Sequence, residues 1–277
     1  MKAPVRGRPF IKMNGLRNHF VIVDAREIPF DPDTPEVVHI CDQQVGVGAD
    51  QLIVLERART ATGADAFMRI INMDGREAEA CGNATRCVAW LLLEEQQGDA
   101  VTIETLAGAL RCERIGKQLV RCEMGRVSMD WRRIPLSEEC DTLHLDIGNG
   151  PLSDAAAASV GNPHAVFFVD DLDAIDVAKL APPLQEHPLF PEQANIGIAQ
   201  MLDGARMRLS VYERGAGLTM ACGSGACAAV FIANARGLLD APRASVELPG
   251  GKVDIEIRAD DVALMSGPVD FNFEGFL

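Results

Sequence analysis

A three-residue step, Ala-Cys-Gly, occurs twice in the chain and constrains its fold more than any other feature. It lies in ACGNATRC around Cys81 and again in ACGSGACA around Cys222. A second pair of segments also repeats: NHFVIVD begins at Asn18, and NPHAVFFVD begins at Asn162. The distance from Asn to Cys is 63 residues in the first copy and 60 in the second. Two matches in the same order, at nearly the same spacing, predict a duplicated unit.

Strand-like segments dominate the chain, and two segments have helical character. The helical segments, residues 82–97 and 223–237, follow the two Cys residues, and a glycine stands at the end of each. Runs typical of strands, separated by polar residues or glycine, are residues 21–23, 67–71, 101–105, 119–123, 165–169, 207–212 and 253–257. We therefore expect two α+β units that face each other across a cleft, with a boundary within residues 125–150.

Composition excludes several classes of protein. Apolar residues make up 48% and charged residues 24% of the 277 residues, which is typical of folded globular proteins. The net charge of −14 repels nucleic acid and anionic membranes. No stretch reaches the roughly 18 apolar residues of a membrane span, and no secretory signal is visible at the first residues. We expect a cytoplasmic protein whose eight cysteines are reduced thiols.

A cysteine at a helix start has distinctive chemistry. The first turn carries unpaired backbone N–H groups and the positive end of the helix dipole, both of which stabilise an anion. This favours the thiolate of Cys81 and Cys222, by about one pKa unit, since the dipole contributes ~0.3–2 kcal/mol and one unit equals ~1.36 kcal/mol. His164 and Glu213 are the candidates for further support. A substrate carboxylate can dock on the N–H groups of Gly82, Asn83, Gly223 and Ser224.

Two thiols in the same context suggest a specific task. One removes a proton from one face of a carbon and the other delivers a proton to the opposite face, which inverts a stereocentre. The remaining cysteines are interpreted as core residues. A metal site built from Cys81, Cys87, Cys222 and Cys227 is not expected, because the spacings do not match common zinc sites. GVGAD is too short for a dinucleotide fingerprint, and CGSGAC lacks the Lys-Ser/Thr of a phosphate loop.

Six motifs in order resemble the diaminopimelate epimerase family over nearly the whole chain: KMNGLRNHFVIVD, VGVGADQ, NMDGREAEACGNATRC, VGNPH, ERGAGLTMACGSGACA and LPGG. The resemblance implies an α+β fold of two pseudo-symmetric halves, each a β-sheet wrapped around a central helix, with the active site in the cleft between them. The halves are expected at residues 1–128, completed by 267–277, and at residues 129–266. It also implies cofactor-independent conversion of LL-diaminopimelate to the meso isomer, for lysine and peptidoglycan precursor synthesis, without pyridoxal phosphate or metal.

By resemblance, Cys81 and Cys222 match the two acid/base residues, and His164 a residue that supports them. Substrate-contacting positions of the family correspond to Asn18, Gln51, Asn72, Asn162, Asn195, Glu213 and Arg214, and its carboxylate cradle to Gly82, Asn83, Gly223 and Ser224. The sequence departs from the family pattern at three positions, Arg17, His19 and Ala84. The family also suggests a homodimer.

Two alternatives remain open at the level of sequence. One is a racemase of another amino acid on the same scaffold, similar to proline or histidine racemases. The distal clamp of Arg214 with Asn72, Asn162 and Asn195 argues for a longer substrate with a second carboxylate and amine. The other is a non-catalytic metal- or ligand-binding protein, against which the retention of both thiols argues.

Overall fold

The computed structural model describes residues 7–60 and 63–277. The chain divides into two compact units. The first unit comprises Met1–Cys122 and Gly267–Leu277, and the second comprises Glu123–Ser266. The chain leaves the first unit within strand β8 (Leu119–Arg126) and returns to it within strand β16 (Val262–Pro268).

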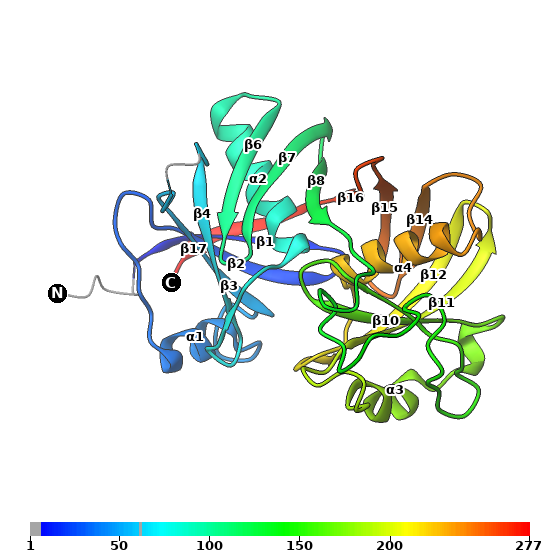
Figure 1. Cartoon of the computed structure of the whole chain (residues 1–277). Helices are drawn as coiled ribbons and strands as arrows, with labels where there is room; N and C mark the ends of the chain where they lie inside the picture. Colours follow the sequence, from blue (N-terminus) through cyan, green and yellow to red (C-terminus); the bar gives the residue numbers. More distant parts are fainter. Residues whose placement is uncertain (1–6, 61–62) are drawn as a thin grey trace. The chain divides into compact units, whose positions relative to one another are not determined.

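The first unit is a mixed sheet that packs on a helix. Besides β8, its elements are β1 (Pro9–Gly15), β2 (Asn18–Asp24), α1 (Thr34–Cys41), β3 (Gln51–Glu56), β4 (Ala66–Asn72), β5 (Glu77–Ala78), α2 (Gly82–Gln96), β6 (Ala100–Thr105), β7 (Gly108–Gly116) and β17 (Asp270–Phe276). Strand β1 pairs antiparallel with β17 and β2, β2 runs parallel to β3, and β4 runs parallel to β6. Helix α2 packs against β1, β2, β6 and β7 (Figure 1).

The second unit is built in the same way. Besides β16, its elements are β9 (Ala156–Ser159), β10 (Pro163–Phe168), η1 (Leu172–Ala174), α3 (Val177–Gln185), β11 (Asn195–Asp203), β12 (Arg206–Glu213), β13 (Gly217–Leu218), α4 (Gly223–Ala235), β14 (Arg243–Leu248) and β15 (Gly251–Ile257). Helix α4 packs against β9, β10, β11, β12, β14 and β15. Figure 1 shows α4 surrounded by strands of its unit.

The strand order repeats between the units. In the first, β2 is parallel to β3, β3 is antiparallel to β4, and β4 is parallel to β6, which follows helix α2. In the second, β10, β11, β12 and β14 pair in the same sequence of directions, and α4 takes the place of α2. The α+β fold class predicted from the sequence is confirmed.

The two predicted helices begin at the predicted residues, Gly82 and Gly223, and end at Gln96 and Ala235. Helix α4 is apolar on all sides, and it is buried because strands enclose it. Two further helices, α1 and α3, were not predicted. Helix α1 has only eight residues, and α3 contains Pro182 and Pro183, which argue against a helix in a reading of sequence alone.

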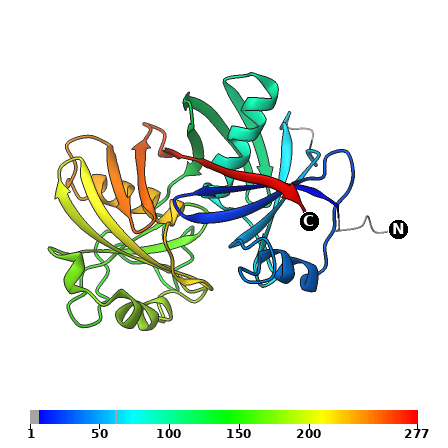
Figure 2. The same cartoon turned by 180° about the vertical axis from the view of Figure 1, so that it is seen from behind.

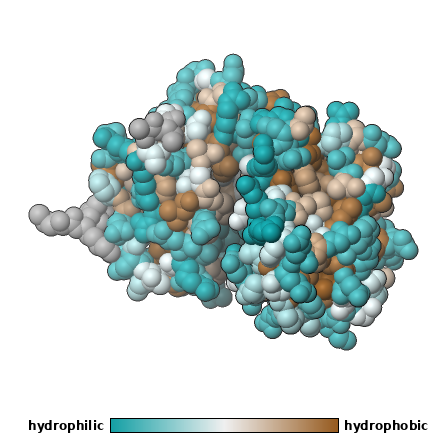
Figure 3. Space-filling view, in the orientation of Figure 1, coloured by the Kyte–Doolittle hydropathy of each residue, from teal (hydrophilic) through white to brown (hydrophobic). Residues whose placement is uncertain are grey.

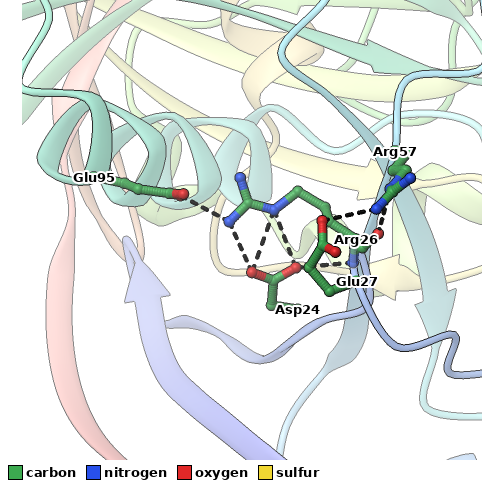
Figure 4. A network of polar contacts seen from close by, with 5 residues as sticks. All are labelled: Asp24, Arg26, Glu27, Arg57 and Glu95. Carbon is green, nitrogen blue, oxygen red and sulfur yellow. Dashed lines mark hydrogen bonds and ion pairs between the residues drawn. The ribbon is translucent and has the colours of Figure 1, made fainter.

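A polar network anchors the far end of α2. Arg26, which follows β2, donates hydrogen bonds to both oxygens of Asp24 and to Glu95 on α2, the last at 2.7 Å (Figure 4). Arg57 donates from Nε to the Arg26 carbonyl at 2.6 Å and from Nη2 to Glu27 at 2.8 Å. Since Arg26 is only 21% exposed, this contact ties the C-terminal end of α2 to the end of β2.

Hydrophilic residues cover most of the surface of both units on the face shown in Figure 3, with smaller apolar patches between them. Strand β17 of the first unit carries three exposed phenylalanines, Phe271, Phe273 and Phe276. Figure 2 shows β17 running beside β1. No helix in the described part of the chain is long and apolar enough to cross a membrane.

Candidate functional site

Cys81 is the N-cap residue of α2. Its backbone is extended (φ −151°, ψ 105°), and its carbonyl accepts a hydrogen bond from the Thr85 N–H at 2.9 Å. The side chain does not cap the helix. The Cys81 thiol instead donates to Asn18 Oδ1, with 3.7 Å between Sγ and the oxygen. Cys81 is therefore a half-buried thiol at a helix start, held by a neutral amide acceptor.

A buried guanidinium lies behind this helix start. Asn18 Oδ1 also accepts from Asn83 Nδ2 at 3.4 Å, and Asn83 Oδ1 accepts from Arg86 Nη2 at 2.8 Å. Arg86 has no exposed surface. A full positive charge one turn into α2 reinforces the preference of the helix start for an anion. Arg86 is not among the predicted site residues, although an arginine among the core-facing residues of an apolar helix is a usable signal.

Gln51 and Asn72 form a directly opposed pair on the antiparallel strands β3 and β4. Gln51 Nε2 donates to Asn72 Oδ1 at 2.8 Å. Gln51 Oε1 is buried and has no hydrogen-bond partner among the described residues. A buried acceptor without a donor is costly, so this oxygen is suited to receive a donor from a bound ligand.

Cys222 is the N-cap residue of α4, in the same extended conformation (φ −113°, ψ 105°). Here the sulfur does cap the helix: it accepts from the Gly225 N–H at 3.4 Å and lies 3.7 Å from Ser224 Oγ. Cys222 is 3% exposed. The two thiols therefore share a place at a helix start but differ in hydrogen bonding and in burial.

Glu213, the last residue of β12, accepts a hydrogen bond from the Thr219 hydroxyl, and its carboxyl interacts with the Cys222 thiol. Burial raises the pKa of Glu213 above its ordinary value of 4.5. Burial, and then the nearby Glu213 carboxyl, raise the pKa of Cys222 well above 9.0. The helix start, expected to favour the thiolate by about one pKa unit, does not by itself make Cys222 a thiolate, because desolvation outweighs the dipole and the N–H of Gly225.

His164 lies close to Cys222 through an intermediate hydroxyl. Its Nε2 lies 3.1 Å from Ser224 Oγ and 3.0 Å from Asn162 Oδ1, while Asn162 Nδ2 donates to Ser224 Oγ at 3.4 Å. Complete burial, with a smaller effect of the Arg214 charge, lowers the pKa of His164 to about 3. The ring is therefore neutral at physiological pH. It orients Ser224 but supplies no positive charge to the thiol.

Asn195 joins three segments of the second unit. Its Nδ2 donates to the Pro163 carbonyl at 3.1 Å, and its Oδ1 accepts from the Arg214 N–H at 2.8 Å. The Arg214 guanidinium donates to the Glu192 carbonyl at 2.8 Å and is otherwise exposed. Arg214 thus presents part of its charged fork to the surroundings, as a ligand clamp requires.

The strand registers show which residues of the two units are equivalent. Gln51 lies opposite Asn72 in the first unit, and the β11–β12 ladder, continued by one residue, sets Asn195 opposite Glu213. A neutral amide in the first unit therefore corresponds to the titratable Glu213 in the second. The parallel ladders pair Gln51 with Phe20, and Asn195 with His164. Equivalent positions in the two units therefore have side chains of different chemical character.

Within each unit the structure brings the predicted residues together. Asn18, Gln51, Asn72, Cys81, Gly82 and Asn83 lie in the first unit, and Asn162, His164, Asn195, Glu213, Arg214, Cys222, Gly223 and Ser224 lie in the second. Sequence reasoning missed Arg86 and Thr219, although both fall inside the motifs around the two Cys residues. In the described ranges, no group of three or more His, Cys, Asp or Glu could hold a metal ion.

Comparison with known proteins gives one family. The model of the diaminopimelate epimerase family matches residues 10–130 and 156–272. Curated proteins with that name include one from Acidiphilium cryptum, 51% identical over 98% of this chain and 96% of the relative. Another, from Phenylobacterium zucineum, is 48% identical over 98% of each chain.

Solved structures of low sequence identity share the fold. A hydroxyproline epimerase from Agrobacterium vitis, with bound trans-4-hydroxy-L-proline, has a TM-score of 0.71 at 14% identity and covers 99% of this chain and 92% of its own. A predicted epimerase from Pseudomonas aeruginosa has a TM-score of 0.68 at 17% identity, with 98% and 99% coverage. At these low sequence identities, the structural similarity supports only the assignment of the fold.

Proposed function

Because the chain belongs to the diaminopimelate epimerase family, we propose that it interconverts LL-2,6-diaminopimelate and meso-diaminopimelate. Cys81 and Cys222 are the two acid/base residues, and neither pyridoxal phosphate nor a metal ion takes part. The observation that carries this proposal is the unequal state of the two thiols. Cys222 lies near a carboxyl group that can take its proton, and Cys81 donates to a neutral amide.

Cys222 becomes a base by passing its proton to Glu213. Glu213 is the carboxyl group near the thiol, and its raised pKa makes its carboxylate a better proton acceptor than an ordinary glutamate. The resulting thiolate is stabilised by the Gly225 N–H and by Ser224. This thiolate removes the α-proton when the reacting carbon has one of its two configurations.

Cys81 delivers a proton to the opposite face of the same carbon. Its thiol donates to Asn18 Oδ1, so the proton to be delivered is already on the sulfur. The proposal requires the two thiols to reach one α-carbon from opposite sides when substrate is bound. In the reverse direction their roles exchange.

The charge that develops as the α-proton leaves spreads onto the substrate's α-carboxylate. The N–H groups at both helix starts cradle that carboxylate; they belong to Gly82, Asn83, Gly223 and Ser224. Preorganised donors of this kind contribute several kcal/mol in a site closed to water. The α-amino group of the substrate fits Gln51 Oε1, the buried acceptor without a partner among the described residues.

The far end of the substrate carries a second carboxylate and amine. We assign its carboxylate to the exposed fork of Arg214, and its polar contacts to Asn72, Asn162 and Asn195. Asn18 and Glu213 complete the substrate-contacting set. A racemase of a small amino acid has no use for this clamp, so the clamp favours diaminopimelate over proline or histidine.

We also propose a cytoplasmic enzyme of lysine and peptidoglycan precursor synthesis. All eight cysteines are free thiols, which fits a reducing compartment. We further propose a homodimer, supported by the exposed Phe271, Phe273 and Phe276 on one strand of the first unit. Sedimentation of the wild-type protein and of a Phe276→Asp variant tests the dimer.

The decisive experiment follows α-proton exchange and stereochemistry in deuterated water. LL-Diaminopimelate is incubated with the protein, and proline, histidine, lysine and glutamate are incubated separately. We expect deuterium at the α-carbon and inversion with diaminopimelate only. Exchange with another amino acid and none with diaminopimelate would identify a different racemase on this scaffold. No exchange with any substrate would support a binding protein.

A further inference from the structure

Asp50 accepts two hydrogen bonds through a single carboxylate oxygen. Oδ2 lies 2.7 Å from the backbone N of His19 and 3.1 Å from Asn18 Nδ2. The backbone of Asp50 is itself fixed, because its N–H donates to the His19 carbonyl at 2.9 Å and its carbonyl accepts from the Met73 N–H at 3.1 Å. The carboxylate is therefore held rigidly against the start of strand β2.

This contact determines which way the Asn18 amide faces. A carboxylate can only accept, so it must meet the NH₂ end of the Asn18 side chain. The carbonyl end, Oδ1, then faces the start of α2, where it accepts from the Cys81 thiol and from Asn83 Nδ2. The reverse orientation would set the Asn18 carbonyl oxygen against the carboxylate and turn the NH₂ group, a donor, towards the Cys81 thiol.

The second unit uses a different device at the equivalent place. Because Gln51 and Asn195 are equivalent in the two sheets, Ala194 takes the place of Asp50 there. Asn162, the counterpart of Asn18, is oriented instead by His164 on one side and by Ser224 on the other. The carboxylate is thus a feature of the Cys81 side alone.

We propose that Asp50 is a positioning residue for Cys81, which acts by fixing the orientation of Asn18. The proposal rests on the proposed function in taking Cys81 as an acid/base residue. Asn18 is oriented by the acceptor oxygen of Asp50, and the negative charge of the carboxylate is not required. Asp50→Asn keeps an oxygen in place of Oδ2, whereas Asp50→Ala removes it.

The first unit offers a matched control in Asp65. Its carboxylate accepts from the Thr102 N–H at 2.7 Å and from Gln96 Nε2 at 3.1 Å, the same kinds of donor at the same distances as at Asp50. None of its contacts reaches Asn18 or either thiol. Asp65→Ala therefore loses the same type of hydrogen bonds but leaves the orientation of the Asn18 amide unchanged.

The first measurement is kcat for epimerisation in both directions. We expect Asp50→Ala to lower kcat about tenfold or more, Asp50→Asn to stay within about threefold of wild type, and Asp65→Ala to leave kcat unchanged. In an Asn18→Ala background, Asp50→Ala should add less than about twofold, because the residue through which it acts is gone. Equal losses for Asp50→Ala and Asp65→Ala, or an undiminished loss in the Asn18→Ala background, would overturn the proposal.

The second measurement does not depend on the substrate. Alkylation of Cys81 and Cys222 by iodoacetamide is followed separately by peptide mass spectrometry. Loss of the acceptor that favours the thiol form should make Cys81 react about threefold faster in Asp50→Ala, with Cys222 unchanged and Asp50→Asn like wild type. Equal changes at both thiols, or no change at Cys81, would refute the positioning role even if diaminopimelate proved not to be the substrate.

A folding defect in Asp50→Ala would be recognised by thermal unfolding against Asp65→Ala. In that event Asp50→Ser replaces it, because its polar side chain is too short to place an oxygen where Oδ2 holds the Asn18 amide. The same kcat and alkylation results are expected from this variant, and wild-type behaviour in both would contradict the proposal.

Discussion

Gly225 lies against the sulfur of Cys222 at the start of α4: its N–H donates to Sγ at 3.4 Å, and a Cβ at this position would lie 3.2 Å from the same sulfur. It would also lie 3.0 Å from Val211 Cγ2. The missing side chain of Gly225 therefore sets the position of the thiol. The equivalent residue in the first unit is Ala84, which is fully buried, so the start of α2 accommodates a methyl group at this position.

Gly225→Ala should lower activity without unfolding the protein. Alanine favours a helix over glycine by ~0.5–1 kcal/mol, which offsets part of the crowding, but the methyl group must displace Cys222 or Val211. Even a displacement of the thiol by less than about 1 Å is expected to lower kcat about tenfold or more. Steady-state kinetics and thermal unfolding of the same preparation separate the two effects.

Ala84→Gly is the matched variant. It should cost roughly 1 kcal/mol of unfolding free energy and leave kcat of the folded enzyme close to wild type. Full activity of Gly225→Ala would show that the thiol has more room than the distances indicate.

Replacement of either helix-start cysteine by serine should abolish epimerisation. Each variant loses a proton carrier, which contributes about 10²- to 10⁴-fold to the rate. Cys140→Ser is the control, because Cys140 is half-buried and outside both helix starts. Epimerisation is followed by chromatographic separation of the LL and meso isomers. A Cys81→Ser variant with near wild-type activity would rule out a two-base mechanism.

The sequence could predict the helix starts and the residues around them, because the duplicated motifs fix what precedes and follows each Cys. It could not predict the protonation of Cys222. The helix dipole can be inferred from the motif, but desolvation depends on how strands enclose α4, and that effect is larger here. Nor could it single out Asp50, since its role depends on which side chain it meets across the fold.

Glu213→Gln should lower the pKa of Cys222 and lower activity together. The Glu213 carboxyl is one of the causes that raise the pKa of Cys222, so its removal stabilises the thiolate. The pH profile of Cys222 alkylation should therefore shift to lower pH. Activity falls about tenfold or more, because glutamine cannot accept the thiol proton. Glu256→Gln, an exposed carboxyl on β15, should change neither quantity. A shift of the profile to higher pH would contradict the assignment.

Arg214→Lys should raise KM for diaminopimelate more than it lowers kcat. Lysine keeps the charge but not the planar fork that binds a carboxylate with two hydrogen bonds. We expect an increase in KM of about tenfold or more, which corresponds to roughly 1.4 kcal/mol. Initial rates over a range of substrate concentration measure the split. Arg206→Lys, in an exposed ion pair with Asp203, is the control. A pure kcat effect would place Arg214 at the reacting centre instead of the distal end.

His164 should make the second unit sensitive to acid. Its pKa is about 3 in the folded protein and 6.5 when unperturbed, so between these values the unfolded chain binds a proton that the folded chain does not. Its contribution is therefore intact above pH 6.5 and is lost progressively as the pH falls towards 3. The expected loss is on the order of a few kcal/mol.

His164→Phe removes the titrating group and installs the residue that the first unit carries at the equivalent position, Phe20. The free energy of unfolding of this variant should fall less steeply with decreasing pH than that of wild type. Urea unfolding, followed by the fluorescence of Trp131 in a Trp90→Phe background, reports on the second unit, because Trp131 is its only tryptophan. His39→Gln, at an exposed site on α1, should leave the pH dependence unchanged. An unaltered slope in His164→Phe would mean that other groups govern acid unfolding of this unit.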